Sequence, residues 1–287
     1  MNNIISVRLM GGLGNQLFQL FTTIAYSEEH GYNVVFPYVS ELHYGIARNT
    51  YWDTFLIGLR NITTYNPDIK ETNDSLLKMP VYQESNFKYH KIPMLTHTKT
   101  LLIGYYQSYK YFEKQWSMIC NMINLNNQQD TIKNEYPNYF LDKETISIHF
   151  RLGDYVKIQD YHPLMPLNYY YNAICNITMR HDRHYRVLYF CQEIDNKEVS
   201  KMISILSKRF SNIEFVKVDD TIEDWKQLLL MSLCSHNIIA NSTFSWWGAY
   251  LNTNICKIVC YPDKWFMPEA NKDTNDLFPP TWMKIYW

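Results

Sequence analysis

The chain lacks the features that several classes of protein require. Its 287 residues carry 27 Lys and Arg against 28 Asp and Glu, a net charge of -1, so we expect neither a nucleic-acid partner nor a polybasic membrane patch. No apolar run approaches the about 18 residues of a membrane-spanning helix, and the N-terminal residues lack the basic flank and apolar core of a secretion signal. These absences predict a cytoplasmic protein, for which peripheral contact with a membrane stays open.

Patterns of cysteine and acidic residues that bind metals are also missing. The six cysteines include no C-x-x-C pair, and most sit in apolar stretches, where a thiol behaves as a small hydrophobe. No Asp-x-Asp occurs where a strand is expected to end, and the acidic residues Glu193 and Asp195 alone make a poor metal site. We therefore expect no metal and no obligatory disulfide.

Glycine is scarce, with nine residues in all, so the cluster within residues 11–14 needs an explanation. It follows an apolar, strand-like run at residues 4–10 and precedes a helical pattern of apolar residues at 15–30. Gly31 stands where a helix C-cap glycine belongs, and the apolar run 34–36 follows it. The first 40 residues thus predict a β-α-β unit with a glycine-rich first turn.

The turn at residues 11–16 allows a ligand to approach the backbone closely, and the helix after it offers N–H groups to an anion. It has neither the G-x-G-x-x-G spacing of a dinucleotide site nor the Gly-Lys-Ser/Thr ending of a P-loop, so neither nucleotide cofactor is predicted. A plain turn between a strand and a helix explains this segment equally well.

The second half of the chain alternates strands and helices. The strand-like runs span residues 146–150, 187–191, 213–218, 237–240 and 257–260, and the helical stretches span residues 168–180, 197–209, 222–235 and 245–251. Parallel strands need a crossover between them, which is normally a helix. The alternation therefore predicts an α/β fold with a doubly wound parallel sheet.

The length of the chain suits two domains of about 140 residues with a cleft between them. Residues 41–139 show only a weak pattern, and the Asn/Gln-rich segment 121–138 is our candidate for the boundary. We place the domains at residues 1–140 and 141–287.

Three segments begin where a predicted strand ends, namely residues 11–16, 149–154 and 241–245. In open α/β sheets the ligand lies beyond the carboxyl ends of the strands. Their placement makes these segments the candidates for a binding site.

Arg151 is the first candidate for contact with an anion. It follows a buried strand and precedes Gly153, which lets the chain turn. A guanidinium binds phosphate oxygens through two N–H groups and keeps its charge, so it can neutralise charge that grows on a leaving diphosphate. An ion pair with Asp154 that holds the loop is the alternative, and the two roles can coexist. We expect His149, at the strand end, to organise the loop.

Residues 241–245 place small hydrogen-bonding side chains between a strand and a helix. Such a turn can cap the helix and hold a phosphate or a base edge at its N-terminus. For Asn241 and Ser242, capping alone is an equal alternative. Trp246 and Trp247 open the helix and could stack on a base or a sugar, although a place in the core suits paired aromatics better.

Three blocks of residues together carry a resemblance. They are Gly-Gly-Leu-Gly-Asn-Gln-Leu-Phe-Gln at residues 11–19, His-x-Arg-x-Gly-Asp-Tyr at 149–155, and Ile-Ile-Ala-Asn-Ser-Thr-Phe-Ser-Trp-Trp-Gly at 238–248. They resemble the signature blocks of the α-1,2-fucosyltransferases, glycosyltransferase family 11. They stand in the right order and span almost the whole chain.

The resemblance implies a GT-B-type fold with two Rossmann-like domains, parallel sheets and an active-site cleft between the domains. The N-terminal domain would face the acceptor, and the C-terminal domain would bind the GDP-sugar. The implied reaction is inverting, metal-independent transfer of L-fucose from GDP-fucose to the 2-hydroxyl of a galactose-containing glycan, with no cofactor besides the donor. The expected catalytic residues are Arg151, Asp154 and His149, and the expected donor-binding residues are Gly12, Gly14, Asn15, Arg151, Asn241, Ser242, Thr243, Phe244 and Ser245.

The chain departs from the family pattern at two places. The family usually has a second arginine where this chain has Leu152, and it commonly has Phe-Ser-Asp-Asp where this chain has Phe-Cys-Gln-Glu at residues 190–193. A transferase with another GDP-sugar or acceptor, and a non-catalytic protein that binds a glycan or nucleotide, therefore stay open. A glycoside hydrolase fits worst, because no pair of carboxylates can be named for it.

Overall fold

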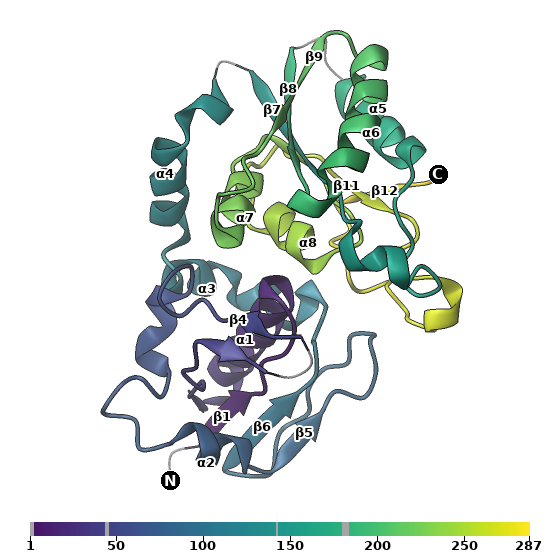
Figure 1. Ribbon diagram of the computed structural model, residues 1–287. Coiled ribbons are helices and arrows are strands. Elements are labelled where there is room, and N and C mark those ends of the chain that lie inside the picture. Colours follow the sequence, from purple (N-terminus) through teal and green to yellow (C-terminus); the bar gives the residue numbers. More distant parts are fainter. Residues whose placement is uncertain (1–2, 44–45, 142, 180–183) are drawn as a thin grey trace. The chain divides into compact units, whose positions relative to one another are not determined.

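The computed structural model describes residues 3–43, 46–141, 143–179 and 184–287, and the chain forms two compact units. Unit 1 contains Met1–Asn127 and Asp273–Pro279, and unit 2 contains Gln128–Lys272 and Pro280–Trp287. Each unit is an α/β structure around its own parallel sheet (Figure 1). The predicted fold class, α/β with parallel sheets, is confirmed.

Unit 1 is built on a four-stranded parallel sheet with the strand order β2-β1-β6-β5. Its strands are β1 (Ile4–Val7), β2 (Asn33–Val34), β5 (Val81–Gln83) and β6 (Lys99–Ile103), and β3 (Glu41–Leu42) and β4 (Arg48–Asn49) form a separate antiparallel pair. The helices are α1 (Leu13–His30), α2 (Asn73–Leu77) and α3 (Trp116–Met122). Helix α4 (Leu125–Glu135) begins in unit 1, continues into unit 2 and occupies much of the Asn/Gln-rich segment.

Helix α1 matches the prediction for residues 15–30 and starts two residues earlier. It ends where Gly31 adopts the left-handed conformation, with φ 68° and ψ 37°, and its N–H bonds to the Ser27 carbonyl. This is the backbone geometry that a C-cap glycine provides. The apolar side chains of α1, such as Leu17 and Phe21, are fully buried in unit 1.

Unit 2 is built on a six-stranded parallel sheet with the strand order β12-β11-β10-β7-β8-β9. The strands are β7 (Glu144–His149), β8 (Tyr185–Phe190), β9 (Ile213–Lys217), β10 (His236–Ile238), β11 (Val259–Pro262) and β12 (Met283–Ile285). The crossover helices are α5 (Leu167–Thr178), α6 (Asn196–Arg209), α7 (Asp224–Ser232) and α8 (Thr243–Tyr250). Five of these strands and all four helices lie where the sequence predicts them, within a few residues, although Arg180 of the predicted helix lies outside the described residues.

The order of the strands in unit 2 reverses between β7 and β10. From β7 the chain adds β8 and β9 on one side, then returns to β10 and adds β11 and β12 on the other. The two central strands pair directly, with Ile146 opposite His236 and Ile148 opposite Ile238. In an open parallel sheet, the crevice at such a reversal is where ligands bind. The loops that follow β7 and β10 therefore flank the expected binding position.

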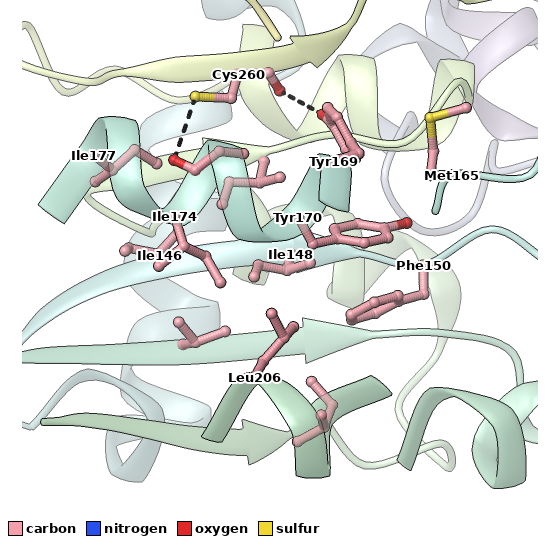
Figure 2. Packing of buried hydrophobic residues seen from close by; sticks show 14 of the residues in the cluster. Ile146, Ile148, Phe150, Met165, Tyr169, Tyr170, Ile174, Ile177, Leu206 and Cys260 are labelled. Atoms are coloured by element: carbon pink, nitrogen blue, oxygen red, sulfur yellow. Dashed lines mark hydrogen bonds between the residues drawn. The ribbon is translucent and has the colours of Figure 1, made fainter. Parts of the chain in front are cut away.

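The two faces of β7 differ in chemistry because successive side chains of a strand point to opposite faces. Ile146, Ile148 and Phe150 join the apolar core beneath α5 and α6, which Figure 2 shows from close by. On the alternate positions, Ser147 accepts a hydrogen bond from Asn237, and the His149 ring lies 5.7 Å from that of Phe244 in α8. His149 therefore faces the helix that carries the third sequence block.

Helix α5 holds the carboxyl ends of the central strands through two buried tyrosines. The hydroxyl of Tyr170 donates to the carbonyl of His149, at the end of β7, over 3.2 Å. The hydroxyl of Tyr169 lies 2.5 Å from the carbonyl of Ile239, just after β10, and 3.2 Å from that of Cys260 in β11 (Figure 2). Both side chains are almost completely buried. Helix α5 thus fixes the backbone where the loops after β7 and β10 begin.

The sequence did not predict several elements. Strands β5 and β12 are only three residues long, and helices α2, α3 and α4 lie in the region of weak pattern between residues 41 and 139. In the described part of the chain, no helix combines the length and the hydropathy that crossing a membrane requires.

We expect Tyr169→Phe to lower the free energy of unfolding by about 1–3 kcal/mol, because it removes the hydroxyl that donates to the buried Ile239 carbonyl. Tyr171→Phe on the same helix is the matched control, since Tyr171 is 38% exposed and its ring contact with Phe210 survives the change. Denaturant unfolding of the two variants measures the difference. Equal stability would show that the Tyr169 hydroxyl does not hold the strand ends.

Candidate active site

The loop after β7 is organised around Arg151. Its Nη1 donates to the side-chain carbonyl of Gln192 over 2.6 Å, and its Nη2 donates to the carboxylate of Asp154. The guanidinium also lies over the ring of Tyr155, with 4.8 Å from its central carbon to the ring centroid. The ion pair with Asp154 that the sequence offered as an alternative is therefore present. Because a guanidinium has five N–H donors, this ion pair does not exclude contact with phosphate.

Tyr155 connects this loop to the loops that follow β10 and β11. Its hydroxyl donates to the carbonyl of Asn241 over 3.2 Å. Its ring stacks on His162, with centroids 4.4 Å apart and an interplanar angle of 17°, and His162 in turn packs on Phe266. Burial lowers the pKa of His162 to about 4, so the stacked imidazole is neutral at physiological pH.

Asn241 holds neighbouring loops together. Its side-chain amide donates to the carbonyl of Pro163 over 2.9 Å and to that of Trp265 over 3.2 Å. Only 1% of its surface is exposed, and among the described residues its Oδ1 has no hydrogen-bond partner. Asn241 thus acts as a bridge between loops and does not cap α8.

The N-terminus of α8 has no side-chain cap. Ser242 is the N-cap residue, but its hydroxyl does not accept a hydrogen bond from the helix. Ser245 turns back toward the carbonyls of Ala240 and Ser242, at 3.5 and 3.3 Å. The first turn, with Thr243 and Phe244, contains no acidic residue. Uncapped N–H groups at a helix N-terminus suit an anion, and capping alone does not explain this block.

Trp246 and Trp247 belong to the core, which was the favoured expectation. Both are completely buried, and Trp246 stacks on Tyr250 with centroids 4.7 Å apart and packs against Trp282. Their rings stabilise α8 and are not available to a base or a sugar.

His149 is buried, with 7% of its surface exposed. Burial first, and the charge of Arg151 second, lower its pKa to about 3. No hydrogen-bond partner of its Nδ1 occurs within the part of the chain that the structure describes. A neutral imidazole packed on Phe244 agrees with an organising role for His149. Near neutral pH the ring does not carry the second proton that a general acid would donate.

In unit 1, the glycine block forms the start of α1. Gly11 has a φ of 75°, and Gly12 is the N-cap residue, so the helix begins without a side-chain cap. Gly14 lies in the first turn, and the side-chain carbonyl of Asn15 accepts a hydrogen bond from Gln107 over 2.9 Å. Gln16 donates to the carbonyls of Gly11 and Asn49, which fixes the turn to strand β4.

Within unit 2 the structure brings two of the predicted groups together. His149 ends β7, and Arg151 and Asp154 follow it. Residues 241–245 follow β10, and the two groups meet through Tyr155 and Phe244. Gly12, Gly14 and Asn15 belong to unit 1. Donor binding by either group stays a prediction.

The loop after β8 contributes two residues that the sequence did not nominate. Gln192 bonds to Arg151, and both carboxylate oxygens of Asp195 accept from the Gly153 N–H, at 3.0 and 2.9 Å. Their position just after a strand was the available signal, but the departure from the family pattern argued against it. Leu152 packs against the apolar core of unit 2, so the position of the second family arginine is occupied by a core contact.

Comparison with known proteins decides the family. The profile of "Glycosyl transferase family 11" matches residues 3–286. The chain belongs to this family. As a member of it, the protein is a glycosyltransferase.

Three relatives match at moderate to low identity. "O-antigen biosynthesis glycosyltransferase WbnK" of Escherichia coli is 29% identical over 193 residues, which cover 64% of this chain and 60% of that protein. "Alpha-1,2-colitosyltransferase" of Escherichia coli is 26% identical over 99% of both chains. "Galactoside 2-alpha-L-fucosyltransferase" of Caenorhabditis elegans is 21% identical over 98% of this chain and 79% of that protein.

The fold agrees with that of a solved structure. The structure of POFUT1 in complex with GDP has a TM-score of 0.55 and 11% identity, and the match covers 91% of this chain and 98% of that one. Together with the parallel sheets of both units, this likeness supports the GT-B-type fold of the family 11 protein.

The family 11 protein should lose stability as the pH falls below about 6.5. The pKa values of His149 and His162 are lower in the folded chain than the ordinary 6.5, so the unfolded chain binds more protons between about pH 4 and 6.5. His149→Gln should reduce the slope of unfolding free energy against pH by up to about 1.4 kcal/mol per pH unit. Denaturant unfolding at several pH values measures the slope, and an unchanged slope would contradict the buried, neutral His149.

Proposed function

We propose that this family 11 glycosyltransferase moves L-fucose from GDP-fucose to the 2-hydroxyl of a galactoside, with inversion and without a metal. The observation that carries the proposal is the match to family 11 across residues 3–286. Its three blocks of signature residues follow strands or begin helices, where a nucleotide-sugar is expected to bind. The relative named as a galactoside 2-α-L-fucosyltransferase supports the choice of donor, acceptor and linkage.

The proposed reaction places the greatest demand on the leaving group. The acceptor oxygen attacks the anomeric carbon of fucose, the bond from that carbon to the diphosphate oxygen breaks, and GDP departs with the bonding electrons. The fucose ring becomes positively charged while the diphosphate becomes more negative. Groups that stabilise this growing negative charge therefore lower the barrier.

Arg151 and the N-terminus of α8 are the groups that we assign to this task. The side chain of Arg151 is only 17% exposed and is held by Gln192 and Asp154. Its planar guanidinium, with its fork of N–H donors, is therefore oriented before a donor binds. The uncapped first turn of α8 supplies N–H groups and the positive end of a helix dipole. Preorganised donors of this kind are typically worth about 10²–10³ in rate.

Asp154 is the proposed acceptor of the proton from the galactoside hydroxyl. Its side chain is 49% exposed, and one carboxylate oxygen is engaged by Arg151. The second oxygen is the one that would take the proton as the new bond forms. Loss of that proton to the carboxylate balances the reaction, and no cofactor besides the donor takes part.

A second donor is favoured by a specific observation. The relative named as an α-1,2-colitosyltransferase matches 99% of this chain at 26% identity. Colitose is therefore the alternative sugar, with the same linkage. The diphosphate contacts proposed above are the same for both donors and do not distinguish them.

A panel of donors and acceptors tests the function. Purified protein is incubated with the GDP derivatives of fucose, colitose and mannose together with β-galactosides, and the linkage of each product is determined by NMR. We expect an α-1,2-linked fucosyl galactoside as the main product. A colitosyl product would establish the alternative donor, and GDP binding without any transfer would indicate a non-catalytic relative.

Arg151→Lys should lower kcat about 10²-fold or more while KM for the donor changes less, because the contact strengthens as the diphosphate leaves. Lysine keeps the charge but loses the planar fork. Steady-state kinetics on the folded variant, with thermal melting as the control, decide the matter. Turnover near that of the wild type would leave Arg151 as a residue that only pairs with Asp154.

Transfer should continue in excess EDTA, since Arg151 and backbone N–H groups are assigned the charge of the diphosphate. The rate is measured before and after chelation and after adding Mn²⁺ or Mg²⁺. Loss of activity on chelation, with recovery on adding either ion, would overturn the metal-independent mechanism.

A further inference from the structure

Asp195 stands at the N-terminus of α6 but does not cap it. It occupies the N-cap position, where an aspartate carboxylate usually accepts an N–H of its own helix. Here the helix receives no side-chain cap, and both carboxylate oxygens accept from the Gly153 N–H, 42 residues earlier in the chain. The residue is 92% buried, with 8% of its surface exposed. The buried carboxylate of Asp195 thus bonds to the loop after β7 instead of to the N–H groups of its own helix.

The same short segment also holds the side chain of Arg151. Gln192 and Asp195 are the ends of one turn, in which the Asp195 N–H bonds to the Gln192 carbonyl over 2.9 Å. Gln192 accepts from Arg151 Nη1 over 2.6 Å. The turn therefore fixes the backbone at Gly153 through a carboxylate and the guanidinium two residues earlier through an amide.

Gly153 leaves the space that this arrangement needs. A Cβ at this position would lie 2.2 Å from Gln192 Oε1 and 2.8 Å from Arg151 Nη1, closer than real contacts allow. The backbone there also has a φ of 38°, which residues with a side chain rarely adopt. Any side chain at Gly153 would therefore disturb the bond between Gln192 and Arg151.

Gln192 and Asp195 differ in charge and in the group that each one contacts. Gln192 is neutral, so it orients Arg151 without cancelling its charge, whereas Asp195 bonds to a backbone N–H and not to the guanidinium. Asp154 is the carboxylate paired with Arg151. A glutamate at position 192 would place a second carboxylate on the guanidinium and compete with an anionic ligand.

We propose that Asp195 and Gln192 are positioning residues that hold Arg151 ready for the diphosphate of the donor. The proposal rests on the proposed function, because it assigns to Arg151 the contact with the leaving group. Neither residue needs to touch the substrate. Their effect on the reaction passes through the loop from Arg151 to Gly153.

Calorimetric GDP binding and donor kinetics on a set of variants test the proposal. Asp195→Ala should weaken GDP binding and lower kcat about tenfold, whereas Asp195→Asn, which keeps an acceptor for the Gly153 N–H, should retain most of both. Gln192→Glu should weaken GDP binding about three- to tenfold. Asp219→Ala is the matched control, since Asp219 is also a loop carboxylate that accepts a backbone N–H, from Thr221, after the neighbouring strand β9.

A double-mutant cycle separates positioning from a general structural role. If Asp195 acts through Arg151, Asp195→Ala should cost about tenfold in GDP affinity in the native chain and less than about twofold in the Arg151→Ala background. Equal losses in both backgrounds, or an equal loss in Asp195→Asn and Asp195→Ala, would overturn the proposal. Thermal melting of every variant shows whether the fold is intact.

The cycle also distinguishes this proposal from the proposed function. If Arg151→Ala leaves GDP affinity and transfer unchanged, the assignment of Arg151 to the diphosphate fails. If Arg151→Ala weakens both but Asp195→Ala and Gln192→Glu do not, the proposed function stands and only the positioning role is wrong.

Discussion

The parallel pairing of β7 with β10 is the constraint on which the candidate site of unit 2 depends. Because the chain builds outward from these two strands in opposite directions, the loops that leave them start from adjacent points and then diverge. Tyr169 and Tyr170 of α5 hold the backbone carbonyls at those points. The places of Arg151 and Asn241 therefore follow from strand order, and the side-chain contacts of the loops refine an arrangement that the sheet has already imposed.

Electrostatics within this arrangement are local. The chain has a net charge of -1 and offers no broad positive field to a negatively charged donor. Burial, together with the positive charge of Arg151, lowers the pKa of His149 to about 3 and keeps the imidazole neutral. Beside the neutral His149, the Arg151 guanidinium keeps its charge, and Gln192 and Asp154 fix its orientation. Such a site depends on the geometry of a few groups more than on their number. The loop after β8 matters because it holds Arg151 through Gln192 and Gly153 through Asp195.

The sequence predicted the sheet of unit 2 well because its strands and helices alternate and each carries a continuous apolar pattern. It also offered the ion pair of Arg151 with Asp154 as an alternative role for Arg151, since the two stand three positions apart in one loop. It could not predict that Asp195 bonds to Gly153, because that contact joins loops 42 residues apart and an aspartate before a helix normally signals a cap. Strands β5 and β12 escaped because Gln83 ends the one and Lys284 interrupts the other, whereas β10, also three residues long, continues into the apolar Ile239 and Ala240. Strands β5 and β12 pair with β6 and β11, which supply their hydrogen bonds.

The choice of sugar would depend on other groups than the proposed binding of the diphosphate. Relatives named for colitose and for fucose match this chain over nearly its whole length, so overall similarity does not decide between the two. A site discriminates strongly between sugars that differ by a hydroxyl only where it offers that hydroxyl a buried hydrogen-bond partner, because the partner is left unpaired when the hydroxyl is missing. Asn241 uses its amide group to hold the loops at Pro163 and Trp265. Asn241, a signature residue, thus holds the backbone of these loops in place. Other side chains on the same loops are the ones that can change with the sugar.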